Sequence, residues 1–164
     1  MTDEQTHKFQ NKLETTYERY YQNVYSRVVE FYRELEKTVP EEQLTAALRT
    51  WSERSSINSV GDQRAANFEE FKDYWKTVSY GDQFSNLVTV EFPHETKTEL
   101  QCKYSECLFA KTFRDLGAED LGKIIGCDVD HVFIQTMNPN LRLERSKTLM
   151  EGHDQCNHTF IWEE

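Results

Sequence analysis

The side chains of this chain that could carry chemistry gather in its last third. Cysteine, histidine and aspartate supply nucleophiles, proton carriers and metal ligands near neutral pH. The candidates are Cys102, Cys107, Cys127, Asp128, Asp130, His131, Arg145, His153, Asp154, Cys156 and His158. The first hundred residues contain no cysteine and follow a mostly helical pattern. The sequence therefore predicts a scaffold half followed by a half that carries the site.

Cys102 is predicted to lie where a strand meets the N-terminus of a helix. A helix N-terminus and the neighbouring Lys103 would both lower the pKa of its thiol. Glu106 would then lie four residues along the same helix face. Cys107 is followed by two large apolar residues, and we interpret it as a small apolar residue of the core, as free cysteine usually is.

Cys127 lies at a predicted break between two helices, directly before Asp128, which is expected to cap the second helix. A thiol at this position can interact with the positive end of a helix. Cys156 falls in the predicted final strand, two residues before His158, so the two side chains should point to the same face. Both cysteines are therefore candidates for a pocket.

Two chemistries fit these residue types, and the residues alone leave both open. In the first, a thiolate attacks an electrophilic carbon while an aspartate or a histidine carries the proton. In the second, three cysteines and one histidine bind zinc; the candidates are Cys102, Cys127 and Cys156 with His131, His153 or His158. The chain contains no C-x-x-C or H-x-x-x-H pair, so the spacing gives zinc little support. We expect neither a metal nor a cofactor.

The elements that must position these residues begin with a helical part. Apolar and aromatic residues recur at helical spacing from Glu4 to Lys37 and predict one long amphipathic helix. A second helix is predicted from Pro40, and the polar, serine-containing residues 55–61 are predicted to form a loop. A third helix then ends at Gly81.

The second part of the chain alternates strand and helix patterns. Residues rich in β-branched side chains predict strands near 87–92, 97–102, 141–149 and 155–162. Helices are predicted over 103–116 and 118–125, the latter stopped by Gly126. A further helix is predicted to end at Met137, because Asn138 precedes a proline and is pushed toward an extended backbone.

These elements predict an α+β fold in which a helical N-terminal half packs on a small antiparallel sheet of about four strands with short helices. A chain of 164 residues, of which 37% are hydrophobic, has material for one core. We therefore expect a single domain over 1–164, with a helical scaffold at 1–80 and the part that carries the site at 86–164.

Charge and hydropathy limit the classes of partner. The formal net charge of −10 argues against a surface for nucleic acid or anionic membranes. No apolar run approaches the about 20 residues of a membrane span, and the polar N-terminus does not resemble a signal peptide. We expect a cytoplasmic protein with free thiols and a small-molecule substrate. The apolar stripe of the first helix is longer than the sheet can cover, so we also expect a homodimer.

The run from Cys102 to Trp162 resembles the L-2-amino-thiazoline-4-carboxylic acid hydrolase family. The pieces that carry the resemblance keep their order and spacing; they are Cys102-Lys103-Tyr104 with Glu106, Leu116-Gly117, Leu121-Gly122, Cys127-Asp128-Val129-Asp130, Asn138-Pro139, Leu143-Glu144-Arg145-Ser146-Lys147-Thr148-Leu149, Gly152-His153-Asp154-Gln155-Cys156, and Phe160 with Trp162. Two departures are visible: Ser146 stands where threonine is expected, and His153 adds an imidazole to the G-x-D-x-C motif.

The resemblance implies a hydrolase that acts on a C–N or C–S bond of a small heterocycle bearing a carboxylate. The family's named member opens an aminothiazoline carboxylate to a carbamoyl derivative of cysteine. The ring carbon between nitrogen and sulfur is electrophilic, so a thiolate or an activated water can add to it, and an acid must protonate the departing ring atom. Two alternatives stay open: a ring-forming or rearranging biosynthetic enzyme with the same pocket, and a small-molecule or metal-binding domain without catalysis.

We expect the cysteines Cys102, Cys127 and Cys156 to surround one pocket with Asp130 and Arg145. Cys127 is the first candidate for the reactive thiol, and Asp130 for the group that relays the proton. By its place in the family motif, Arg145 is the candidate for binding the substrate carboxylate, because a guanidinium binds carboxylate through two parallel hydrogen bonds. The remaining candidates for substrate binding are Glu106, Asn138 and His131.

Overall fold

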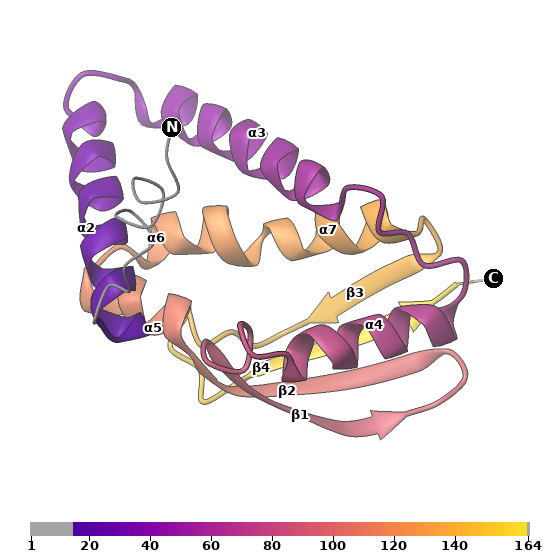
Figure 1. Cartoon of the computed structure of the whole chain (residues 1–164). Coiled ribbons are helices and arrows are strands. Elements are labelled where there is room, and N and C mark those ends of the chain that lie inside the picture. Colours follow the sequence, from indigo (N-terminus) through magenta and orange to yellow (C-terminus); the bar gives the residue numbers. More distant parts are fainter. Residues whose placement is uncertain (1–14, 164) are drawn as a thin grey trace, which may run out of the picture.

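The computed structural model describes residues 15–163 and has an α+β fold (Figure 1). Its first helices are α2 (Tyr17–Glu36), α3 (Glu41–Val60) and α4 (Phe68–Tyr80). The predicted fold class is confirmed; the part of the first predicted helix at residues 4–14 lies outside the described residues. Within the described range, no helix combines the length and the apolar character that crossing a membrane would require.

Four antiparallel strands form one sheet in the order β1-β2-β4-β3. The strands are β1 (Val88–Glu95), β2 (Glu99–Cys107), β3 (Leu141–Arg145) and β4 (Cys156–Trp162). All four lie where strands were predicted, but β3 ends four residues earlier than expected. The reason is a tight turn: the Gly152 amide donates to the Leu149 carbonyl, and Gly152 has a φ of 86°, a conformation that favours glycine.

The segment between β2 and β3 is helical; it contains α5 (Leu108–Asp115), α6 (Glu119–Gly122), a π-helical turn η1 (Lys123–Cys127) and α7 (Val129–Met137). One apolar cluster fills the space between α4, α7 and the inner face of the sheet; it includes Phe71, Leu100, Ile134, Leu141 and Phe160. A second cluster joins α2 to α5 and α6; it includes Val29, Phe113, Leu121 and Met150. The fold therefore has two apolar centres rather than one.

Helix α3 runs through the segment that we predicted to be a loop. Its serines recur at helical spacing and line the side that faces α7; they are Ser52, Ser55, Ser56 and Ser59. Ser56 Oγ donates to the Val129 carbonyl at 3.3 Å, which ties the two helices together. The prediction of a loop over 55–61 is wrong. It rests on the content of serine, which is common in loops, whereas the spacing of the serines is that of one helix face.

Strand β2 is longer than predicted, and this moves the start of the following helix. The helix predicted over 103–116 starts only after Cys107, because the residues before it pair with β1 and β4. Cys107 therefore occupies the helix N-terminus, and its Sγ accepts a hydrogen bond from the Ala110 amide at 3.4 Å. The prediction that Cys102 lies at this junction is wrong, since it lies within β2 opposite His158.

The π-helical turn η1 replaces the helix end that we predicted at Gly126. The Asp128 amide donates to the Lys123 carbonyl, five residues back, at 2.8 Å. A Cβ atom at Gly126 would overlap the ring of Phe109 on α5, so glycine is required for the close approach of these two helical segments. Such turns widen a helix locally and are frequent at functional sites. Here the turn carries Cys127 at its end.

The start of α7 also differs from the prediction, whereas its end does not. Asp128 has helical backbone angles and makes no capping hydrogen bond through its side chain, because α7 continues directly from η1. The predicted cap is therefore wrong; the Asp128 carboxylate forms an ion pair with Arg49 at 2.9 Å. The helix ends at Met137, before Asn138-Pro139, as predicted.

An apolar and aromatic stripe on α2 is exposed; its residues are Tyr17, Tyr20, Val24, Val28 and Phe31. An exposed apolar stripe of this kind favours association. We therefore expect two copies to associate through α2, and light scattering at micromolar concentration to give the mass of a dimer. Phe31→Ser should shift the equilibrium to monomer, whereas Val78→Ser, at an exposed position on α4, should not. A monomeric wild-type protein would contradict this prediction.

Candidate active site

The candidate site lies where the two apolar clusters of the fold meet. Cys107 and Cys127 pack against the cluster of α2, α5 and α6, whereas Cys156 packs against the cluster on the inner face of the sheet. Leu149 contacts both clusters. Polar groups at such a boundary lose much of their hydration, and their pKa values shift accordingly.

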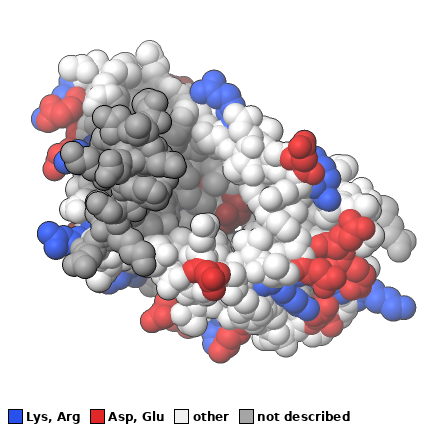
Figure 2. Space-filling model, in the orientation of Figure 1, with Lys and Arg blue, Asp and Glu red and all other residues white. Residues whose placement is uncertain are grey.

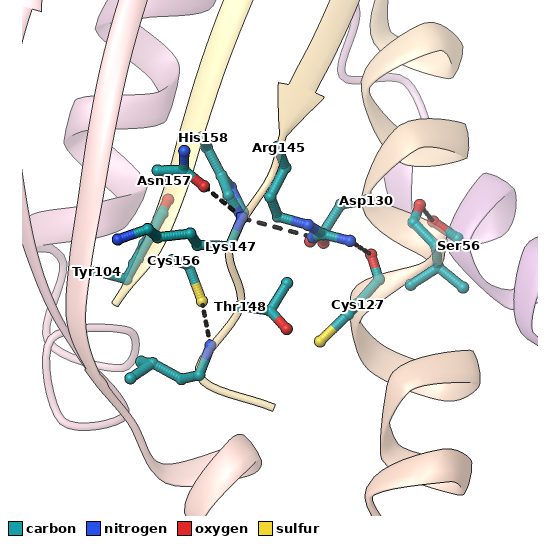
Figure 3. Close-up of polar contacts among 12 residues, drawn as sticks. Ser56, Tyr104, Cys127, Asp130, Arg145, Lys147, Thr148, Cys156, Asn157 and His158 are labelled. Atoms are coloured by element: carbon teal, nitrogen blue, oxygen red, sulfur yellow. Dashed lines mark hydrogen bonds and ion pairs between the residues drawn. The ribbon is translucent and has the colours of Figure 1, made fainter. Parts of the chain in front are cut away.

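An ion pair between Asp130 and Arg145 joins the helices to the sheet at this boundary (Figure 3). Arg145 Nη1 donates to Asp130 Oδ2 at 2.7 Å, and Nη2 donates to the Cys127 carbonyl at 3.0 Å. The Arg145 side chain is only 7% exposed, whereas the Asp130 side chain is 33% exposed. Asp130 is therefore the member of the pair that a ligand or water can reach.

The Asp130 carboxyl is suited to proton transfer near neutral pH. It lies in a recess among protein atoms, and this loss of hydration raises its pKa to about 6, although the Arg145 guanidinium acts in the opposite direction. A group whose pKa lies close to the working pH can both accept and return a proton. Burial, and then the charge of Arg145, lower the pKa of the adjacent His131, which favours a neutral imidazole.

Three thiols lie close enough to Asp130 for its charge to affect them; they belong to Cys107, Cys127 and Cys156. Burial raises the pKa of all three, that of Cys127 to about 12, and the Asp130 carboxylate raises each further. Cys156 Sγ also accepts a hydrogen bond from the Leu149 amide at 3.2 Å, which acts against this rise. The thiols are thus protonated at neutral pH, and thiolate chemistry would require a proton acceptor beside them.

His158 contacts the ion pair from β4. Its Nε2 lies 3.5 Å from Arg145 Nη1, and its ring centroid lies 4.9 Å from that of Tyr104. Burial, and then Arg145, lower the pKa of this imidazole to about 3, so it is neutral. Its Nδ1 is buried and has no hydrogen-bond partner within residues 15–163. His158 therefore borders the ion pair as an uncharged side chain and does not carry a proton at neutral pH.

Cys102 does not take part in this arrangement. It is 2% exposed within the core, and burial raises its pKa to about 12. Its polar neighbours are Trp75 and Tyr104, not the Asp130–Arg145 pair. Of the three cysteines expected around the pocket, two lie near Asp130, and Cys107 takes the place of Cys102.

The three candidates for substrate binding lie in different surroundings. Glu106 is exposed on β2 and accepts a hydrogen bond from Thr89 Oγ1 at 2.5 Å. Asn138 Nδ2 donates to the Ala65 carbonyl at 2.9 Å, so this side chain fixes the turn after α7. His131 follows Asp130 on α7 and lines a groove with Arg145. Among the three, His131 is the one beside the ion pair.

Three hollows adjoin these residues. The largest of the three has a volume of about 850 Å³. It lies between the first turn of α2, helix α5, the start of β1 and the end of β2, and Cys107 is part of its lining. The Asp130–Arg145 pair does not line it. A groove of about 480 Å³ contains Arg145, and a hollow of about 270 Å³ between α3 and α7 contains Asp130. Figure 2 shows a hollow in the face that is turned toward the viewer in Figure 1, with acidic atoms visible at its bottom.

A metal site is not formed by the described residues. Within residues 15–163, no group of three His, Cys, Asp or Glu side chains is arranged to hold one ion. The zinc alternative therefore has no ligand set there. The four cysteines are free thiols.

Sequence reasoning missed three features of this site. Cys107 packs against an apolar cluster, in line with its interpretation as an apolar residue of the core, but its position at the end of β2 was not predicted; continued strand alternation beyond Cys102 was the available signal. His158 is predicted to share a strand face with Cys156 and is a candidate zinc ligand, but its contact with Arg145 is not predicted. The serine face of α3 was read as a loop, although its spacing was the available signal.

The comparisons with known proteins come from a family model and from solved structures. The model described as L-2-amino-thiazoline-4-carboxylic acid hydrolase matches residues 17–160. No curated protein matches the chain. Trafficking protein particle complex subunit 3 from Naegleria fowleri, covalently bound to palmitic acid, is 15% identical with a TM-score of 0.47, and the match covers 90% of this chain and 95% of that one. The Fe(II) unliganded H-NOX protein from K. algicida is 12% identical with a TM-score of 0.30, over 90% of this chain and 61% of that one. Likeness at these scores supports no inference.

Proposed function

Because the chain belongs to the L-2-amino-thiazoline-4-carboxylic acid hydrolase family, we propose that it hydrolyses a C–N or C–S bond in a small heterocycle that bears a carboxylate. The observation that carries the proposal is the environment of the Asp130 carboxyl and the pKa that results from it. Its carboxyl is partly exposed, has a pKa of about 6, and is held by a buried guanidinium. This combination is what a general base needs near neutral pH.

The proposed reaction adds one water across a ring bond. Asp130 accepts a proton from water while the water oxygen bonds to the ring carbon between nitrogen and sulfur, and the electron pair of the C=N bond moves to its nitrogen. The bond from this carbon to the ring sulfur or ring nitrogen then breaks, the remaining hydroxyl proton passes to nitrogen as the carbonyl forms, and the departing atom takes the proton back from Asp130. The product contains every atom of the substrate and of the water, and the enzyme returns to its starting state.

We propose that Arg145 is a positioning residue. Its guanidinium already donates to Asp130 and to the Cys127 carbonyl, and its side chain is almost fully buried. A guanidinium engaged in this way orients the carboxylate and limits the rise of its pKa. This role differs from the substrate-carboxylate contact that the family motif suggested.

The nucleophile is proposed to be water rather than Cys127. With its pKa raised to about 12, the Cys127 thiol is a far weaker proton donor to Asp130 than attack as a thiolate would require. We therefore expect Cys127→Ser to keep turnover of the aminothiazoline carboxylate within about tenfold of wild type. The assay follows the release of a thiol or an amine with reagents specific for each, which also identifies the ring bond that breaks.

Cys102→Ser is the matched control for this variant, because it also removes a buried thiol but lies away from Asp130. If Cys127→Ser loses turnover while Cys102→Ser keeps it and both variants fold, the nucleophile is the Cys127 thiol and the water route is wrong. If wild-type protein releases neither thiol nor amine from the substrate, the proposed reaction itself is contradicted.

A further inference from the structure

Four serines are among the residues that line the hollow between α3 and α7. Its volume is about 270 Å³, and the two helices lie side by side along it (Figure 1). Its lining includes Trp51, Ser52, Ser55, Ser56, Asp130 and Phe133. Small side chains alone would explain close helix packing, so the serines by themselves do not make a binding site.

Ser52 supplies the second observation. Its side chain lines the hollow and is 3% exposed, yet Oγ has no hydrogen-bond partner within the described part of the chain. Two neighbouring hydroxyls are occupied: Ser56 Oγ donates to the Val129 carbonyl, and Ser59 Oγ donates to the Ser56 carbonyl at 2.7 Å. Ser55 is exposed to solvent. A buried hydroxyl without a partner costs stability, so its presence requires a reason. A ligand that completes the missing hydrogen bond is such a reason.

The charge of the lining selects the kind of ligand. Among the described residues that line this hollow, Asp130 is the charged one; its partner Arg145 contacts it from outside the lining. A carboxylate placed in the hollow would lie against the Asp130 carboxylate with no lysine or arginine of the lining beside it, whereas a group that carries N–H donors would meet hydroxyl and carboxylate acceptors. Trp51 and Phe133 add aromatic surface to the lining, which suits a cationic or planar group.

We propose that this hollow is the subsite for the nitrogen-bearing end of the substrate, an amino or amidinium group, with Ser52 Oγ as a hydrogen-bond partner and Asp130 as the counter-charge. The proposal rests on the proposed function, since it uses the same aspartate. It adds the chemical class that the site selects: small, planar molecules with an N–H donor end. It also assigns to Ser52 a role in specificity.

The experiment measures binding of acetamidinium to the intact protein by ¹H–¹⁵N NMR, with acetate as the control ligand. Acetamidinium should shift the Trp51 indole N–H and the amides of Ser52 and Ser56 in a saturable manner, and acetate should not. Ser52→Ala should weaken this binding about fivefold to tenfold, the loss of one hydrogen bond. The same variant should keep or raise the Tm of the ligand-free protein, because it removes an unpartnered buried hydroxyl.

Thr50→Ala is the matched control, since Thr50 is exposed on the same helix and does not line the hollow. Saturable shifts that Ser52→Ala leaves unchanged, or shifts absent up to tens of millimolar acetamidinium, overturn the subsite. A lower Tm for Ser52→Ala with unchanged binding assigns Ser52 to packing and overturns it as well. Binding as expected in a protein that does not open the heterocycle would leave the subsite standing and reject the proposed reaction, so the two failures can be told apart.

Discussion

Replacing Asp130 with asparagine is expected to lower kcat/KM for ring opening by about 10²–10⁴-fold, the usual contribution of a general base. Asparagine has nearly the same shape and can still accept the hydrogen bond from Arg145, but it cannot accept a proton. The variant should lose stability, because the buried Arg145 charge loses its counter-charge, but it should still fold without denaturant, since the asparagine oxygen keeps the hydrogen bond from Arg145. Steady-state kinetics together with circular dichroism measure both quantities.

Asp128→Asn is the matched control for this variant. Asp128 lies two residues away, and its carboxylate pairs with Arg49 rather than with Arg145. Its turnover should remain close to wild type. If both variants lose activity equally, the effect comes from the net charge near α7, and the assignment of Asp130 as base fails.

The pH dependence of the wild-type enzyme follows from the same group. The ionised form of Asp130 is the base, so kcat/KM should rise with pH through about 6 and level off above it. Below that value the rate should fall about tenfold per pH unit, because only the ionised fraction is active. A profile that rises only above pH 8 or so would indicate a thiolate instead.

Replacing Arg145 with glutamine is expected to destabilise the protein by about 3–5 kcal/mol, the usual cost of breaking a buried ion pair. The buried guanidinium donates to Asp130 and to the Cys127 carbonyl, and the charged contact is lost in the variant. Because Arg145 lowers the pKa of Asp130, its loss should also move the acid limb of the kcat/KM profile above pH 6. Urea unfolding and the pH profile measure the two effects.

Arg142→Gln is the control on the same strand. Arg142 lies on the exposed side of β3 and pairs with Glu144 and Glu163 at the surface, so its loss should change stability little. The double variant Asp130→Asn/Arg145→Gln should be more stable than Arg145→Gln alone, because it leaves no unpaired carboxylate. A pH profile that stays at wild type in Arg145→Gln would show that Arg145 does not act on Asp130.

The sequence predicted the fold class and the positions of the four strands because these depend on local periodicity. Alternation of β-branched residues marked the strands, and proline at position 139 marked the end of α7. The errors lie at the boundaries between consecutive strands and helices. The strand-to-helix boundary at Cys107 depends on pairing of β2 with two other strands, and residues distant in sequence set that pairing.

The site was only partly predictable for a related reason. The motif indicated Cys127, Asp130 and Arg145 together, but periodicity does not say which charges become buried. The pKa of Asp130 and those of the thiols depend on the boundary between two apolar clusters, which forms only in the folded chain. The serine face of α3 shows the same limit, since its partner α7 lies far along the sequence.

The most direct test of the account is ring opening of the aminothiazoline carboxylate in water enriched in the heavy oxygen isotope, with the product analysed by mass spectrometry. The account predicts a carbamoyl product that carries one solvent oxygen, formed by wild-type protein and by Cys127→Ser but not by Asp130→Asn. A product with the elemental composition of the substrate, or labelled product formed at the wild-type rate by Asp130→Asn, would contradict it.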